Sequence, residues 1–212
     1  MKIGAFVLGS CLVASAAQAG LMQLSQTAYS SGNGGEFRGE LIGAAFTPMS
    51  LSGNGFETFC LERGENFSPG GIYHYDVNIA ATLGGGGSSG GMDPLDERTA
   101  YIYRLFISGS LVGYDYANAF GQRSNNAGSL QNVIWYLEQE VGSLDSADAV
   151  SWYALAQNGI GLGLGDVRVL NLYNLNDVGE RIERQDQIVR VPAPGALALS
   201  LGGVAMILRR RR

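Results

Sequence analysis

The chain has 212 residues, 46% of them hydrophobic, and a formal net charge of -5 at neutral pH. This length and apolar content are enough for one sizeable core, so we expect a single domain with a processing segment at each end. The body from Gly20 to Val191 carries nine arginines against nineteen acids, a net charge of -10. Nucleic-acid binding needs a basic surface, so this balance argues against a nucleic-acid partner.

Residues 1–19 have the pattern of a secretory signal peptide. A basic residue precedes the apolar run 3–16, and a small-x-small pattern ends at Ala19. We therefore expect cleavage between Ala19 and Gly20 and export of the mature chain. The surroundings of Cys11 resemble a lipoprotein cleavage box, which is the alternative for this end. On the main interpretation Cys60 is the single cysteine of the mature chain, and it cannot form an internal disulfide.

Short apolar runs in the first half of the chain predict strands. They lie at Leu41–Phe46, Phe56–Leu61 and Ile72–Val77, separated by stretches rich in Gly, Ser and Asn. In the third run, apolar and polar residues alternate around His74, which is typical of a half-buried strand. The chain has 32 glycines, many of them in this half, which favour strands and turns over long helices.

Two helices are predicted in the middle of the chain. Asp93 is expected to cap the first, with Pro94 in its first turn and Gly109 at its end. The second follows from apolar residues at helical spacing: Leu130, Val133, Ile134, Leu137 and Val141. With Ser129 as its N-cap, Gln131 would lie in the first turn, beside the unpaired amides.

The last third of the body predicts a short helix and then strands. The helix is expected at Ala147–Gln157, and the closing strands at Val167–Leu172 and Ile188–Val191. Together the elements predict an α+β fold. A strand-rich N-terminal half, forming a small β-sandwich or barrel, packs with two to three helices and is completed by strands at the C-terminal end.

The tail after residue 191 has three consecutive parts. They are Val191-Pro192-Ala193-Pro194, the uncharged and mostly apolar segment Gly195–Leu208, and Arg209-Arg210-Arg211-Arg212. This order resembles the PEP-CTERM sorting signal of Gram-negative bacteria, with Ala193 where the motif usually has Glu. The resemblance implies processing by an exosortase-type enzyme, transient contact with the inner membrane, and a final location in the envelope, at the outer surface or in the extracellular matrix. A plain C-terminal membrane anchor is the alternative.

Four motifs follow one another along the body of the chain. They are Phe59-Cys60-Leu61-Glu62, Thr99-Ala100-Tyr101-Ile102-Tyr103, Leu130-Gln131-Asn132-Val133-Ile134-Trp135-Tyr136-Leu137 and Gln185-Asp186-Gln187-Ile188-Val189. The stretch from Phe56 to Val191 resembles the thioester-domain proteins found among PEP-CTERM-tailed proteins, and more distantly the thioester domains of Gram-positive adhesins. The adhesin motif resembles Thr-Gln-x-Ala, whereas Leu130 and Val133 stand at the flanking positions here.

The resemblance implies an internal thioester between Cys60 and Gln131 in the domain 20–191. The cysteine sulfur would attack the glutamine carboxamide and ammonia would leave, with first-turn helix amides as oxyanion donors. The supporting side chains expected are one acid for proton transfer and three aromatic shields against water: Glu62, Phe59, Trp135 and Tyr136. For Glu62, a solvated acid without a role is the alternative. A target amine or hydroxyl would then attack the Gln131 carbonyl, so the protein would act once and would not be a turnover enzyme.

Two other functions remain open at this stage. The first is a structural envelope or biofilm-matrix protein without a reactive thioester. The second is a Cys-His hydrolase or transglutaminase in which His74, the single histidine, would activate Cys60. One cysteine and one histidine do not make a zinc site, so we expect neither a metal nor a cofactor.

Overall fold

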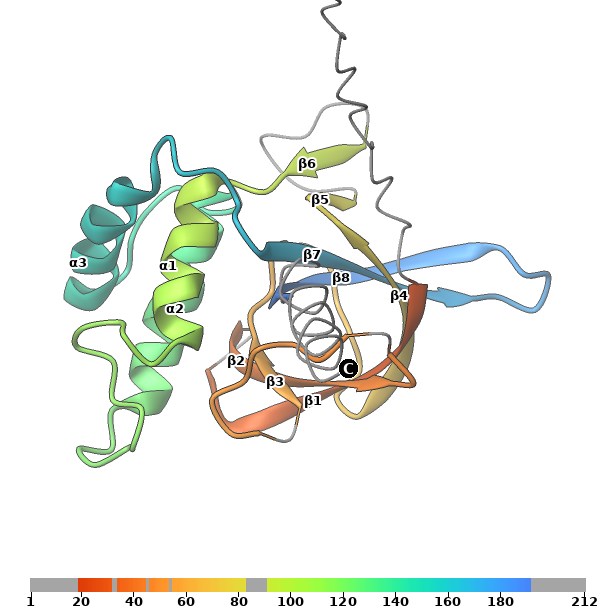
Figure 1. Cartoon of the computed structure of the whole chain (residues 1–212), viewed down its shortest axis with the longest axis horizontal. Coiled ribbons are helices and arrows are strands. Elements are labelled where there is room, and N and C mark those ends of the chain that lie inside the picture. The colour runs from red at the N-terminus through yellow and green to blue at the C-terminus, as the bar shows by residue number, and fades with distance from the viewer. Residues whose placement is uncertain (1–18, 32–33, 45, 54, 83–90, 192–212) are drawn as a thin grey trace, which may run out of the picture.

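The computed structural model describes residues 19–31, 34–44, 46–53, 55–82 and 91–191 (Figure 1). Two predicted segments lie outside these residues. They are residues 1–18 of the leader, and the tail with Pro192, Ala193, Pro194 and Arg209 to Arg212. The strands are β1 (Ala19–Ser31), β2 (Gly34–Ile42), β3 (Phe56–Thr58), β4 (Gly71–Asn78), β5 (Ala80–Thr82), β6 (Met92–Pro94), β7 (Val167–Leu175) and β8 (Arg181–Arg190). The helices are α1 (Glu97–Ile107), α2 (Arg123–Leu137), α3 (Ala147–Ala156) and the 3-10 turn η1 (Gln157–Gly159). Within the described ranges, no helix has the length and apolar character that crossing a membrane requires.

Six strands form one antiparallel sheet in the order β3-β2-β1-β4-β7-β8, and β5 pairs with β6 separately. The large sheet curls until its two outer strands meet (Figure 1). They meet where the chain just after β3 pairs with β8, at an antiparallel bridge between Cys60 and Gln187. We call this junction the seam. The predicted α+β fold is confirmed, with a curled, barrel-like sheet in the strand-rich half, three helices, and β7 and β8 as the closing strands.

Neighbouring residues at the seam face two different hydrophobic cores. Side chains alternate between the faces of a strand, so the chain at Phe59, Cys60 and Leu61 contributes to both. The core inside the curled sheet contains Met22, Leu24, Phe37, Phe56, Cys60, Tyr73, Tyr75, Leu170, Leu172 and Val189. The core between sheet and helices includes Phe59, Leu61, Phe106, Leu130, Ile134, Val169 and Ile188. The Cys60 side chain therefore points into the barrel.

The strands predicted in the first half are only partly correct, and the run Phe56–Leu61 is a strand only over Phe56–Thr58. β4 covers the run expected at Ile72–Val77, with the alternation expected around His74. The strand expected at Leu41–Phe46 is wrong, because β2 begins at Gly34 and ends at Ile42. Gly43 follows with a φ of 66°, a left-handed conformation that turns the chain out of the sheet.

The start predicted for the first helix is wrong by several residues. Asp93 and Pro94 belong to β6, and the cap of α1 is Asp96, whose carboxylate accepts the Arg98 N–H at 2.7 Å. The predicted stop is confirmed, because Gly109 follows the helix with a φ of 70°.

The start predicted for the second helix is also wrong. Helix α2 begins at Arg123, so Ser129 lies inside it, where its hydroxyl accepts a hydrogen bond from Ser146 at 2.8 Å. Gln131 is consequently well inside the helix, 1% exposed and on the side that packs against β1 and β2. The third helix is close to its predicted place, with Ser146 as cap accepting the Ala149 N–H at 3.1 Å.

Candidate functional site

Cys60 is fully buried at the seam, and its backbone has an unusual set of partners. In the pairing with β8, the flanking residues make the hydrogen bonds: Leu61 N–H to Asp186 at 3.1 Å and Ile188 N–H to the Phe59 carbonyl at 3.2 Å. Cys60 and Gln187 thus form a non-hydrogen-bonded pair, and the N–H and C=O of Cys60 point away from β8. Buried backbone groups need partners, so another element has to supply them here.

The Gln131 carboxamide supplies both partners. Its Oε1 accepts the Cys60 N–H at 3.1 Å, and its Nε2 donates to the Cys60 carbonyl at 2.7 Å. A side chain of α2 therefore takes the place that the next strand would take in a wider sheet. The two residues expected to react with each other are 71 positions apart in sequence and in direct contact in the fold.

A glycine makes this close contact possible. A Cβ on Gly34, in β2, would lie 2.5 Å from Gln131 Cγ and 2.8 Å from Trp135 Cη2. Real Cβ atoms do not approach other atoms so closely, so the Gln131 side chain fits in this position only because residue 34 has no side chain.

The Cys60 sulfur has a polar partner of its own. Gln187 Nε2 donates to Sγ at 3.5 Å and to the Gln185 carbonyl at 3.3 Å, so its carboxamide is fixed beside the sulfur. Burial raises the pKa of the Cys60 thiol far above its usual range, the Gln187 hydrogen bond lowers it, and the nearby Glu62 raises it. The thiol is therefore neutral at physiological pH.

Glu62 is buried, not solvated. It is 3% exposed, and its Oε2 accepts the Asp186 N–H at 3.0 Å. Its Oε1 has no hydrogen-bond partner among the described residues. Burial raises the pKa of Glu62 first, and the charges of Asp186 and Glu65 raise it further. Glu62 is consequently a protonated acid two residues from Cys60, able to hold a proton but not to act as a strong base.

Gln131 is one of the residues that line a surface pocket of about 380 Å³. Its walls come from α2 and from the loops around residues 63 and 143: Arg63, Gly128, Gln131, Asn132, Trp135, Val141, Gly142, Ser143 and Asp145. The Asn132 side chain holds the second loop, donating to the Ser143 carbonyl at 3.3 Å and accepting the Asp145 N–H at 3.1 Å. Gln131 thus forms part of the pocket wall although it is only 1% exposed, whereas Cys60 is fully buried and does not line the pocket.

Of the three aromatic residues expected to shield the site, only Trp135 lies against Gln131. Phe59 points to the other face of the seam, where its ring packs edge-on against Phe106 at 5.0 Å. Tyr136 packs edge-on against Tyr153 at 5.1 Å. The expectation for Phe59 and Tyr136 is therefore wrong, because strand alternation and helical rotation turn consecutive residues to different sides.

His74 does not join Cys60. It stacks on Tyr173 at 5.2 Å, and its neighbours Tyr73 and Tyr75 are the residues of β4 that enter the core containing Cys60. No hydrogen bond links His74 to Cys60 in the described part of the chain, and the same residues contain no group of three or more His, Cys, Asp or Glu arranged to hold a metal. A Cys-His pair would have required His74 on the opposite face of its strand.

Gln187 is the functional candidate that the sequence reasoning missed as a site residue. The available signal was the run Gln185-Asp186-Gln187 directly before the apolar strand residues Ile188 and Val189. Such polar residues are seldom fully buried, so a run of them in a buried strand points to specific partners. All three are buried in the structure: Gln185, Asp186 and Gln187.

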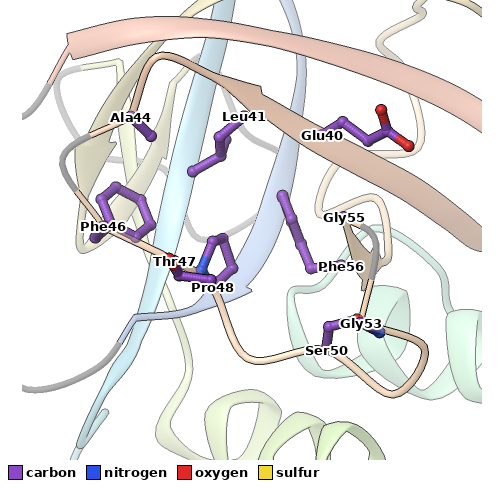
Figure 2. A pocket seen from close by; sticks show the side chains of 10 residues that line it. All are labelled: Glu40, Leu41, Ala44, Phe46, Thr47, Pro48, Ser50, Gly53, Gly55 and Phe56. Atoms are coloured by element: carbon purple, nitrogen blue, oxygen red, sulfur yellow. The ribbon is translucent and has the colours of Figure 1, made fainter.

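A second and larger pocket, of about 800 Å³, lies between the end of β2 and the loop that follows it (Figure 2). Its lining includes Phe56, which shares the inner core with Cys60, but neither Cys60 nor Gln131 reaches it. Comparisons with family models, with curated proteins and with solved structures found no match.

Proposed function

We propose that Cys60 and Gln131 form an internal thioester, and that the exported protein uses it once to attach itself covalently to a nucleophile on a surface or in a matrix. The observation that carries the proposal is the pair of hydrogen bonds, at 3.1 and 2.7 Å, between the Gln131 carboxamide and the Cys60 backbone. They hold an amide, a poor electrophile, in fixed contact with the residue that bears the nucleophile.

The bond-forming step is a transfer of the acyl group from nitrogen to sulfur. Sγ of Cys60 adds to Cδ of Gln131, the Cδ–Nε2 bond breaks, and ammonia leaves with the thiol proton. The Cys60 N–H already donates to Oε1 at 3.1 Å, so it is the oxyanion donor in the tetrahedral intermediate. The Cys60 N–H therefore takes the role expected for the first-turn amides of the helix. Helix α2 begins at Arg123, so its first-turn amides lie about two turns away from Gln131.

Gln187 and Glu62 have supporting positions in this reaction. Gln187 donates to Sγ, which stabilises negative charge that develops on the sulfur as its proton leaves. Glu62 is a buried, protonated acid two residues from Cys60, so it can donate its proton to the leaving nitrogen and be reprotonated by the thiol proton.

Capture would occur through the pocket at Gln131. An amine or hydroxyl on the target attacks Cδ, the Cδ–Sγ bond breaks, and the Cys60 thiol reappears while the target stays on Gln131 as an amide or ester. Because the glutamine is not restored, the reaction occurs once per molecule. The leader and the sorting tail support attachment outside the cell, after processing by an exosortase-type enzyme at the inner membrane.

The alternative is a structural envelope or matrix protein in which Gln131 stays an amide. The observation in its favour is that both Cys60 backbone groups are satisfied only while the amide is intact, because loss of ammonia removes the donor to the Cys60 carbonyl. In this case the contact is a side-chain substitute for a missing strand.

Methylamine labelling separates the two functions. The thioester predicts one methylamine on Gln131 per molecule, with one new free thiol at Cys60, and no labelling of the Cys60→Ala variant. A free Cys60 thiol in untreated, freshly isolated protein, with no methylamine on Gln131, would exclude covalent capture and leave the structural role.

A further inference from the structure

Four acidic side chains lie around the loop that follows the seam. Two belong to this loop, which runs from Glu62 to Glu65 and which we call the acid loop; the others are Glu140, after α2, and Glu183, in β8. Each has one buried carboxyl oxygen without a hydrogen-bond partner in the described part of the chain. A buried polar atom without a partner costs free energy, and native proteins contain few of them. Four in one region therefore indicate a ligand that the hydrogen bonds of the chain do not supply.

Glu65 is at the centre of this group. Burial raises its pKa most, and the charges of Glu183 and Glu140 raise it further. Arg184 lowers it, and the resulting pKa of Glu65 is about 7. The charge of Glu65 in turn raises the pKa of two buried acids, Glu62 and Asp186. All these carboxyls are therefore within electrostatic reach of Glu65.

The neighbouring cations do not neutralise the group. Arg181 pairs with Oε1 of Glu183 at 2.7 Å, and Oε2 of Glu183 is left without a partner among the described residues. Arg184 donates to Asn174 at 2.8 Å and to the Glu183 carbonyl at 3.2 Å, so these hydrogen bonds go to uncharged groups. Nor does the described chain arrange its acids to hold a metal ion. A proton is the ligand that fits, because a carboxyl protonated on one oxygen donates to an oxygen of the next.

The acid loop is held at the candidate site by two of these carboxyls. Oε2 of Glu62 accepts the Asp186 N–H at 3.0 Å, and Oε2 of Glu140 accepts the Arg63 N–H at 3.0 Å. Arg63 is also part of the wall of the smaller pocket, together with Gln131. The position of the acid loop therefore determines the shape of the pocket at Gln131.

We propose that Glu65, Glu140 and Glu183 form a proton-operated latch, which holds the acid loop against β8 and the end of α2. Protons shared between these carboxyls keep the loop closed. When the carboxyls ionise, their negative charges repel one another and the loop moves outward. Arg63 moves with the loop, so the pocket at Gln131 widens. The consequence for capture rests on the proposed thioester, whereas the latch itself does not.

The direction of the pH dependence follows from the state that binds the proton more tightly. Glu65 has a pKa of about 7 in the closed loop, against an ordinary value of 4.5 for a glutamate in water. The closed loop therefore holds its proton where the open loop has lost it. Closure is favoured most below pH 4.5 and is progressively lost as the pH rises to about 7.

Hydrogen exchange of the full chain tests the latch directly. Peptides that cover residues 61–67 are compared at about pH 5 and about pH 8, after correction for the intrinsic pH dependence of exchange. We expect these residues to lose protection at least about tenfold between the two conditions, and peptides of α1 to lose none. Glu65→Gln should keep the protection at both, because an amide does not ionise. The matched control is Asp177→Asn, an exposed acid between β7 and β8, which should behave as the wild type.

Equal protection of residues 61–67 at both pH values, or the same loss in Glu65→Gln as in the wild type, would overturn the latch. Methylamine labelling of Gln131, at equal concentrations of unprotonated amine, tests the link to the pocket. Labelling should accelerate with pH in step with exchange in the wild type, and not in Glu65→Gln. Equal acceleration in both proteins would overturn that link. No labelling in either protein, with the expected exchange result, would count against the thioester and in favour of the latch.

Discussion

Two glutamines contact Cys60 from opposite sides, and their surroundings differ. Gln131 comes from a helix, binds the Cys60 backbone and lines an open pocket. Gln187 comes from a strand, binds the Cys60 sulfur and is fully buried. Both carboxamides contact Cys60, one at its backbone and the other at its sulfur, so contact alone does not separate their roles.

Access and polarisation separate the two glutamines. The Gln131 carbonyl accepts a backbone N–H, and Gln131 lines a surface pocket, where the proposed capture would need the acyl group. The Gln187 amide donates to sulfur and is closed off, which suits a positioning residue. In the proposed reaction, Gln131 is therefore the acyl residue and Gln187 the positioning residue.

Truncating each of the two glutamines should give the largest difference between them. Gln131→Ala removes the acyl group and leaves two buried Cys60 backbone groups without their partner, so we expect no thioester and a loss of about 2–4 kcal/mol in the free energy of unfolding. Gln187→Ala should keep the thioester but form it more slowly. Intact mass over time after synthesis, with denaturant unfolding, measures both; identical mass histories for the two variants would contradict the assignment.

Enlarging Gly34 tests whether the position of Gln131 matters. Gly34→Ala places a Cβ 2.5 Å from Gln131 Cγ, so we expect the side chain to move, thioester formation to fall and stability to drop by about 1–3 kcal/mol. Gly64→Ala is the matched control, because no atom lies within 4 Å of a Cβ there. A normal mass deficit of one ammonia in Gly34→Ala would show that the contact is not needed.

Removing the Trp135 ring should shorten the lifetime of the thioester and have less effect on its formation. Trp135→Ala widens the pocket at Gln131, so we expect faster hydrolysis, followed as the gain of one water in mass. Tyr136→Ala removes a ring that packs on Tyr153, away from the site, and should leave the lifetime unchanged. Equal lifetimes in both variants would mean that Trp135 is not the shield.

The smallest expected effect is on the pH dependence of stability. Burial keeps Glu62 protonated in the fold well above its ordinary pKa of 4.5, whereas in the unfolded chain it ionises near that value. The unfolded state then binds fewer protons, so the free energy of unfolding falls as the pH rises above 4.5, until the folded group ionises as well. The thermal unfolding temperature of Glu62→Gln should fall less steeply with rising pH over this range than that of the wild type. Parallel curves for the two proteins would argue against a buried acid.

The sequence was informative where local pattern and tertiary position agree. Alternation identified β4, and the left-handed Gly109 marked the end of α1. Helix α2 was located but its start at Arg123 was missed, because the residues before Ser129 are mostly polar or small, including the buried Asn126, and a hydrophobic period does not register them. Such residues are buried only because distant parts of the chain satisfy them.

The two residues of the site could be named from the sequence, but the side chains that surround them could not. The resemblance to thioester domains named Cys60 and Gln131, and the fold brings them into contact. Closure of the sheet at the seam, with Gln187 on the sulfur, depends on pairing between residues 127 positions apart, for which the sequence has no local signal. The direction of Phe59 follows from strand alternation, which turns it to the face opposite Cys60.

The most direct test of the central claim is the mass of the freshly isolated protein, followed by mapping of its cross-linked peptides. We predict a mass one ammonia below that calculated from the sequence, and one peptide pair joined from Cys60 to Gln131, both lost in Cys60→Ala. The full calculated mass with a freely titrating Cys60, or a bond that ends at Gln187, would contradict it.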